Sequence, residues 1–321
     1  MSRLGYQIPN FTYAGVAPSE LFATVAAQAR EADASAFDRV TVMDHFYQLP
    51  MLGAPDEPMI ECYTLLSALA QHTERVRLSA MVTGNTYRNP TLLAKSVTAL
   101  DLVSSGRATL AMGAGWFELE HDALGFEFGT FSDRFEKLEE ALQIVLPLLR
   151  GEKVSLDGDH YKVVDAVNSP APLSEIPVMI GGGGEKKTLR MVAQYADESN
   201  LGSTPAEEIP RKLDALAAHC ERLGRDRAEI AVTSLIPCNV APTMEQAEAD
   251  LVAMAAAKGW NHEIVELAKT MIVHGDPDTV GEALAERMAT GIDGLDLSLP
   301  ACGHLPGRVA LLAEVADAAI G

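Results

Sequence analysis

Four consecutive glycines are the residues of this sequence with the most direct chemical use: Gly181, Gly182, Gly183 and Gly184. They follow the short apolar run 177–180 and precede an amphipathic stretch that begins at Glu185, which predicts a buried strand, a turn and a helix. Glycine lets a ligand approach the backbone closely, and the free N–H groups at a helix start suit a phosphate. A tight turn with positive φ is the alternative, but it explains one or two glycines. The run therefore predicts a phosphate site.

A histidine beside a carboxylate ends another predicted strand, because Asp44 and His45 follow residues 39–43. Histidine titrates near neutral pH, so His45 can serve as a general base or as a hydrogen-bond donor. Adjacent residues of an extended chain point in opposite directions, and a solvated loop pair is the alternative interpretation. The same alternative, side chains that face water, applies to a later polar group: Glu118, Glu120, His121 and Asp122.

A tryptophan marks a third strand end, since Trp116 directly follows Gly113, Ala114 and Gly115. One of only two tryptophans in the chain, it predicts an aromatic wall for a flat ring, with packing at the rim of the fold as the alternative.

Small and polar residues end two further strands. Thr83, Gly84 and Asn85 follow the third predicted strand, where they would line a cofactor face or form an ordinary turn. Asn200 and Leu201 lie at the end of the sixth. These strand ends complete the candidate site.

The elements that must position these residues alternate between strand and helix along the whole chain. Eight strands are expected, at residues 4–8, 39–43, 75–84, 108–113, 177–180, 197–201, 230–236 and 294–299. This alternation predicts an α/β fold, a (β/α)8 TIM barrel formed as one domain by residues 1–321, with an open doubly wound sheet as the alternative. Two alternating runs over 153–164 predict a β-hairpin inserted after the fourth βα unit, and 259–275 looks like a second insertion. A barrel brings the ends of its strands to one mouth.

Composition excludes several classes of function. The chain has 321 residues with 25 Lys and Arg against 45 Asp and Glu, a formal charge of −20, which argues against nucleic acid and anionic membranes as partners. No apolar run is long enough to span a bilayer, and the first residues, 1–6, carry no apolar signal segment, so a cytoplasmic protein is expected. Four widely spaced cysteines indicate neither a metal site nor disulfides.

Taken together, the motifs resemble the bacterial-luciferase-like (luciferase-like monooxygenase) superfamily, in particular the coenzyme F-420-dependent (deazaflavin) oxidoreductases that are numerous in actinobacteria. The resemblance rests on five segments, at residues 44–45, 73–90, 100–107, 113–121 and 180–188. It implies a barrel whose third strand carries a non-prolyl cis peptide behind the deazaflavin ring, by position at Met81 and Val82. It also implies that Asp44, His45 and the residues after strand four flank the ring, that the glycine run holds the phosphate, and that the protein is a homodimer.

The resemblance implies hydride transfer between the deazaflavin and a small organic substrate whose identity the sequence does not reveal. In the sugar-phosphate dehydrogenases of this superfamily the histidine is the base and a glutamate just after strand four is the acid. Trp116 occupies the matching position here, so Glu120 would replace that acid only if its segment turns inward.

Three further expectations concern the cofactor. Because the coenzyme is polyanionic, nearby cations should offset the acidity of the chain, and we expect Arg88, Lys186, Lys187 and Arg190 to do so. An FMN-dependent monooxygenase is the alternative within the superfamily. A barrel that binds a cofactor or metabolite without catalysis is the alternative from another class.

Overall fold

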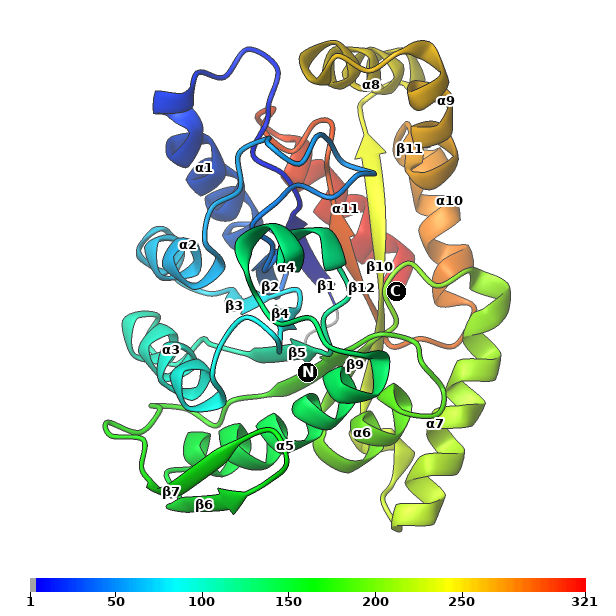
Figure 1. The fold of residues 1–321 in the computed structure, drawn as a ribbon. Helices are drawn as coiled ribbons and strands as arrows, with labels where there is room; N and C mark the ends of the chain where they lie inside the picture. The colour runs from blue at the N-terminus through cyan, green and yellow to red at the C-terminus, as the bar shows by residue number, and fades with distance from the viewer. Residues whose placement is uncertain (1–3) are drawn as a thin grey trace.

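Parallel strands arranged around a barrel form the centre of the computed structural model, which describes residues 4–321 (Figure 1). The strands of the barrel sheet are β1 (Leu4–Ile8), β2 (Arg39–Val42), β3 (Arg77–Ala80), β4 (Thr83–Gly84), β5 (Leu110–Gly113), β8 (Val178–Gly181), β9 (Glu198–Asn200), β10 (Ala231–Val240) and β12 (Gly294–Ser298). Their order in the sheet is β3-β2-β1-β12-β10-β9-β8-β5-β4. A parallel bridge between Leu78 and Ala108 joins the two ends of this order. The barrel prediction is confirmed, and the open-sheet alternative is wrong.

The third barrel strand is divided into two segments, β3 and β4. The residues between them are Met81 and Val82, and the peptide bond that joins these two is cis, at the position that the resemblance implied. β3 pairs with β2, whereas β4 pairs with β5 through Thr83 and Gly84. The single strand expected over 75–84 is therefore interrupted where it reaches the mouth of the barrel.

The segment expected as an insertion at 259–275 adds a helix and a strand to the rim. Its strand, β11 (Val273–Gly275), pairs with the end of β10, with Cys238 opposite Val273. β10 consequently continues to Val240, four residues past the end predicted from the sequence. An edge partner that is distant in sequence lengthens the strand, which local patterns do not reveal.

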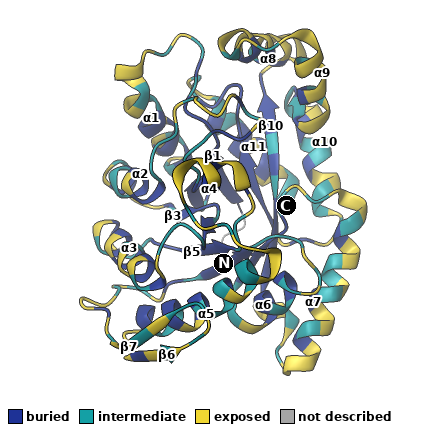
Figure 2. Cartoon of the chain, viewed as in Figure 1, coloured by how far each residue is buried: buried dark blue, intermediate teal, exposed yellow. Residues whose placement is uncertain are grey.

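Most helices surround the barrel and bury one face against it, while their outer faces are exposed (Figure 2). Within residues 4–321, no helix is both long and apolar enough to cross a membrane. The four cysteines are buried and unbridged. Residues 1–3, part of the stretch considered for a signal segment, lie outside the described residues. The α-helices are α1 (Leu21–Asp33), α2 (Cys62–Leu69), α3 (Pro90–Val103), α4 (Glu118–Leu124), α5 (Phe131–Leu149), α6 (Thr188–Tyr195), α7 (Ile209–Leu223), α8 (Met244–Lys258), α9 (His262–Met271), α10 (Pro277–Met288) and α11 (Arg308–Ile320). Of these, α4, α8 and α9 do not contribute to the main core cluster of the described residues.

Two short strands lie outside the barrel, between α5 and β8. β6 (Val154–Asp157) and β7 (Lys162–Ala166) pair antiparallel. The Glu140 side chain of α5 accepts hydrogen bonds from the backbone N–H groups of Asp159, His160 and Tyr161, which anchors the turn between these strands to α5.

A buried ionic network lies in the interior of the barrel. Arg39 is 1% exposed and donates to Glu198 at 2.6 Å and to Asp296 at 2.9 Å. Gly5 leaves the necessary room, because a Cβ atom there would lie 1.9 Å from Asp296 Oδ1. Asp296 also accepts a hydrogen bond from Asn200 Nδ2 at 2.9 Å. The network therefore fixes the side chain of Asn200 at the end of β9, next to the mouth.

Candidate active site

One pocket of about 480 Å³ opens at the mouth of the barrel, where the strand ends meet. It confirms that widely separated segments converge there. Of the residues singled out from the sequence, those that line it are Asp44, His45, Met81, Val82, Thr83, Gly84, Gly113, Ala114, Gly115, Trp116, Gly181, Gly182, Gly183, Gly184 and Asn200.

Val82 and two glycines form one wall of the pocket. A Cβ atom added to Gly113 would lie 2.8 Å from Val82 Cγ2, and one added to Gly181 would lie 2.9 Å from Val82 Cγ1. Side chains at these two positions are thus excluded by close packing. The wall consists of backbone and one branched side chain, a surface without projecting groups that suits a flat ring.

The glycine run lies at another part of the pocket. Gly182 has φ +116°, a conformation that side chains rarely adopt, and its N–H donates to Asn200 O at 2.8 Å. Within residues 4–321, the N–H groups of Gly183 and Gly184 have no hydrogen-bond partner. Thr188, the first residue of α6, also lines the pocket here. Free N–H groups before a helix are the donors that a phosphate requires.

Arg134 of α5 supplies the cation of this pocket lining. Its guanidinium lies over the Phe128 ring at 3.8 Å, and Nη1 donates to Gly129 O at 3.0 Å. Nε is buried and has no hydrogen-bond partner within the described chain. A buried donor without an acceptor costs free energy, and the Arg134 guanidinium is the charged group of the lining that an anion would meet.

The cations that the sequence predicts near the phosphate are paired with other groups or exposed to solvent. Arg190 pairs with Glu139 at 2.6 Å, and Lys187 donates to Ser132 Oγ at 3.1 Å. Arg88 is held by two carboxylates, described below, and Lys186 is exposed. The one sequence pattern that could have indicated Arg134 as a site residue is its helical spacing with Phe131 and Phe135. A helix face of this kind usually packs against the core, so the pattern does not distinguish a site residue from a core neighbour.

His45 is held by a carboxylate from the segment after β5. The Glu120 side chain is completely buried, and its Oε1 lies 2.6 Å from His45 Nδ1. Glu120 Oε2 accepts the N–H groups of Phe46 at 2.9 Å and Tyr47 at 3.2 Å, and Tyr87 OH donates to Oε1. A carboxylate only accepts, so Nδ1 carries the proton and Nε2 is left for a ligand.

The hydrogen bonds also determine the protonation of Glu120. Burial acts to raise the pKa of Glu120, but the bonds from His45, Tyr87 and Phe46 together hold that pKa below its ordinary value. The residue is therefore ionised at neutral pH. α4 makes this possible, since the long loop expected after Trp116 instead contains a helix that directs Glu120 and His121 inward and leaves Glu118 and Asp122 exposed.

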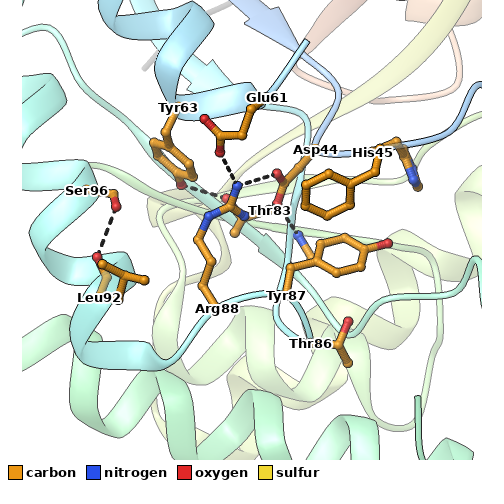
Figure 3. Close-up of polar contacts among 12 residues, drawn as sticks. Asp44, His45, Glu61, Tyr63, Thr83, Thr86, Tyr87, Arg88, Leu92 and Ser96 are labelled. Atoms are coloured by element: carbon orange, nitrogen blue, oxygen red, sulfur yellow. Dashed lines mark hydrogen bonds and ion pairs between the residues drawn. The ribbon is translucent and has the colours of Figure 1, made fainter. Parts of the chain in front are cut away.

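Asp44 points away from His45 and belongs to a separate ionic cluster (Figure 3). Arg88 donates to both carboxylate oxygens of Asp44, at 2.7 and 2.9 Å, and to Glu61 at 2.5 Å. The N–H of Gly84 donates to Asp44 Oδ2 at 3.0 Å. Burial raises the pKa of Asp44 while Arg88 opposes that change. Asp44 thus links the ends of β2 and β4, with both carboxylate oxygens engaged.

Trp116 is 55% exposed, a large value for tryptophan, and lines the pocket beside His45. Its ring is edge-on to the His45 ring at 5.8 Å and stacks on Phe117 at 5.3 Å. One apolar face of the indole is therefore available to a ligand.

Three predicted site residues do not line the pocket: Glu120, which is buried behind His45, Leu201 and Asn85. Leu201 packs in the hydrophobic core, because Glu198 and Asn200 face the barrel interior and alternation directs Leu201 to the opposite side. Asn85 is buried beside β5, to which its N–H donates at Gly113 O. Lining residues that the sequence did not single out for the site include Tyr87, Phe131, Arg134, Phe135, Thr188 and Leu235.

Known proteins resemble this chain over nearly its whole length. A model of the luciferase-like monooxygenase family matches residues 2–294. The F420-dependent glucose-6-phosphate dehydrogenase 1 of Rhodococcus jostii (strain RHA1) is 29% identical over 301 residues, which cover 85% of this chain and 86% of the relative.

Solved structures share the fold. A structure described as an F420-dependent secondary alcohol dehydrogenase in complex with an F420-acetone adduct has a TM-score of 0.80 and 20% identity, covering 100% of this chain and 99% of the other. A long-chain alkane monooxygenase has a TM-score of 0.77 and 15% identity, covering 98% and 89%. Because the family model spans most of the sequence, the chain belongs to the luciferase-like monooxygenase family.

Proposed function

We propose that this protein is a coenzyme F-420-dependent oxidoreductase that transfers a hydride between the deazaflavin and a small organic substrate. One observation carries the proposal: a single pocket combines free backbone N–H groups and the unpartnered Arg134 Nε with a smooth wall at Val82 and a histidine whose Nε2 is free. The F420-dependent dehydrogenase of Rhodococcus jostii supports the choice of coenzyme.

The residues present fit this coenzyme. Gly183, Gly184 and Arg134 would bind its phosphate, and Val82 with Gly113 and Gly181 would support its ring. When bound, the deazaflavin supplies a site that accepts or donates a hydride. The protein contributes orientation and the accompanying movement of a proton.

His45 is the residue placed to move that proton. Because Glu120 holds Nδ1 protonated, the neutral ring presents Nε2 as an acceptor, and the protonated ring presents it as a donor. Glu120 is ionised and already accepts four hydrogen bonds, so we assign it the positioning of His45 rather than the role of acid. Asp44, engaged by Arg88, positions the strand ends.

Titration of the purified protein with coenzyme F-420 and with FMN, followed by fluorescence, tests the proposal. We expect coenzyme F-420 to bind at least about tenfold more tightly than FMN, a difference of roughly 1.4 kcal/mol. Tight FMN binding without deazaflavin binding would favour the monooxygenase alternative. Binding of reduced coenzyme F-420 without turnover of any acceptor would favour a non-catalytic barrel.

Arg134→Gln should weaken coenzyme F-420 about tenfold, because a charge-assisted hydrogen bond to the phosphate is lost. The phosphate-free deazariboflavin should bind the variant and the wild type equally. Lys137→Gln is the matched control, since Lys137 lies on α5, carries the same charge and pairs with Glu127. An equal loss for both ligands would place Arg134 outside the phosphate site.

The proposal includes a homodimer, as the family resemblance implies, and a location in the cytoplasm, as expected from the sequence. Sedimentation velocity of the purified holoenzyme at micromolar concentration checks the oligomeric state.

A further inference from the structure

We propose that the substrate is an uncharged, apolar alcohol or ketone that binds between His45 and Trp116, and that sugar phosphates are rejected. This inference rests on the proposed function and specifies its substrate class. It departs from the dehydrogenase of Rhodococcus jostii, whose name specifies a sugar phosphate.

The wall around His45 is apolar and aromatic. Trp116 and Phe117 both meet the His45 ring edge-on at 5.8 Å, and they stack on each other. Phe117 also belongs to a buried cluster with Met43 and Leu49, against which Tyr47, Leu52 and Met59 pack. The cluster supports the Trp116 ring, which is exposed and lines the pocket, and a hydroxylated, phosphorylated substrate would lose its hydration against that ring without regaining hydrogen bonds.

Two cations at the rim of the barrel are each neutralised by the protein itself. Lys258, at the end of α8, has a side chain that is 0% exposed and that pairs with Glu57 at 2.5 Å. Burial lowers the pKa of Lys258, and Glu57 opposes that change. Arg88 is likewise occupied by Asp44 and Glu61. A substrate phosphate would have to displace a carboxylate from either cation.

The Lys258–Glu57 pair also shapes the mouth. Glu57 lies in the segment between β2 and α2, and in Figure 1 this segment extends toward the end of β10, from which α8 follows. Glu57 accepts the N–H of Ala54 at 3.2 Å, so the pair anchors the turn around Gly53 to α8. The Lys258–Glu57 ion pair therefore stabilises the rim, and neither residue has an unpaired charge left for a ligand.

The electrostatic field at the mouth opposes anionic substrates. The chain carries −20 overall, and the exposed Glu118 and Asp122 lie on the helix that directly follows Trp116. A negative field lowers the local concentration of anions and slows their association. Arg134, the cation of the pocket lining, is assigned to the coenzyme phosphate. Because the coenzyme is bound in every catalytic cycle, Arg134 is not available to an anionic substrate.

An alcohol or ketone matches the proton chemistry of His45. Oxidation of a secondary alcohol removes a hydride from the carbinol carbon, which the coenzyme accepts, and a proton from the hydroxyl oxygen, which His45 Nε2 accepts. Reduction of a ketone reverses both transfers. Each direction transfers one hydride, which carries two electrons, and one separate proton, and the proton uses the single nitrogen that Glu120 leaves free.

Matched substrates test the inference on the holoenzyme, after its coenzyme dissociation constant has been measured on the same preparation. The pairs are cyclohexanol with hydroxycyclohexanecarboxylate, cyclohexanone with oxocyclohexanecarboxylate, and short secondary alcohols with their carboxylated analogues; glucose-6-phosphate is added separately. We expect kcat/KM for the uncharged member to exceed that of its partner at least about a hundredfold, because burying an unpaired charge is costly. Added salt should raise kcat/KM only for the anions, since it screens the field.

Trp116→Ala should raise KM for the uncharged substrates about tenfold, through loss of apolar contact, and Trp116→Phe should restore most of the affinity. Three outcomes would each overturn the inference. They are a preference for the anionic members, efficient use of glucose-6-phosphate, and no turnover of any uncharged member by the coenzyme-loaded enzyme. Because coenzyme binding is measured independently, these outcomes are distinct from failure of the proposed function.

Discussion

Replacement of His45 by alanine is expected to lower kcat by roughly 10²–10⁴-fold, the range found for loss of a general acid or base. His45 Nδ1 is fixed by Glu120, which leaves Nε2 for a ligand, and His45 lines the same pocket as Trp116 and Val82. Without the imidazole, the substrate oxygen has no group to exchange its proton with. The measurement is a single-turnover rate for coenzyme oxidation or reduction, with the uncharged substrate that the wild type uses best.

Two further measurements separate catalysis from structure in this variant. The coenzyme dissociation constant should change less than about tenfold, and the thermal midpoint should fall by only a few degrees, because one side chain at the pocket edge is removed. His262→Ala, at an exposed position on α9, is the matched control and should behave as the wild type. A turnover rate of His45→Ala within about threefold of the wild type would remove His45 from the mechanism.

Replacement of Glu120 by glutamine is expected to lower the free energy of unfolding by roughly 1.5–3 kcal/mol at pH 7, the contribution of hydrogen bonds to a buried charged acceptor. Glutamine has one acceptor oxygen where the carboxylate uses two, and its NH₂ group would face the N–H donors of Phe46 and Tyr47 or the donor at Nδ1 of His45. Turnover should fall as well, since His45 loses the group that fixes its tautomer.

The stability difference should depend on pH in a defined direction. The folded pKa of Glu120 lies below its unfolded value of about 4.3. Its stabilising contribution is therefore complete above that pH and is lost as the pH falls through the folded pKa. The wild type and Glu120→Gln should differ most near neutrality, and the difference should shrink as the pH falls below the unfolded pKa and toward the folded pKa. Urea unfolding across this range is the measurement, with the exposed Glu118→Gln as control; a difference that is constant with pH would contradict the ionised state.

For Asp44 and His45, local sequence patterns predict the directions of the side chains but not their partners. Strand alternation predicts that the two side chains diverge, and they do: Asp44 joins Arg88, and His45 joins Glu120. The partners themselves lie 44 and 75 residues away in sequence. Glu120 turns inward because α4 forms, and a short helix after a glycine-rich strand end leaves no strong periodic signal.

The phosphate end of the pocket shows a similar limit. The glycine run was recognisable because only backbone approach explains four glycines, and the structure brings it to the predicted mouth. The cation was not recognisable, since charges near the run in sequence, such as Arg190, are bound by helix neighbours, whereas Arg134 arrives from α5. Tertiary packing, which has no local signature, decides which of several cations faces a ligand.

A crystal structure of the protein with bound coenzyme F-420 is the most direct test of the account. It should show the deazaflavin ring against Val82, beside His45 and Trp116, with the phosphate on the N–H groups of Gly183 and Gly184 and within hydrogen-bond distance of the Arg134 guanidinium. A ring bound elsewhere, or a phosphate that contacts neither the glycine run nor Arg134, would contradict the assignment of this pocket as the coenzyme site.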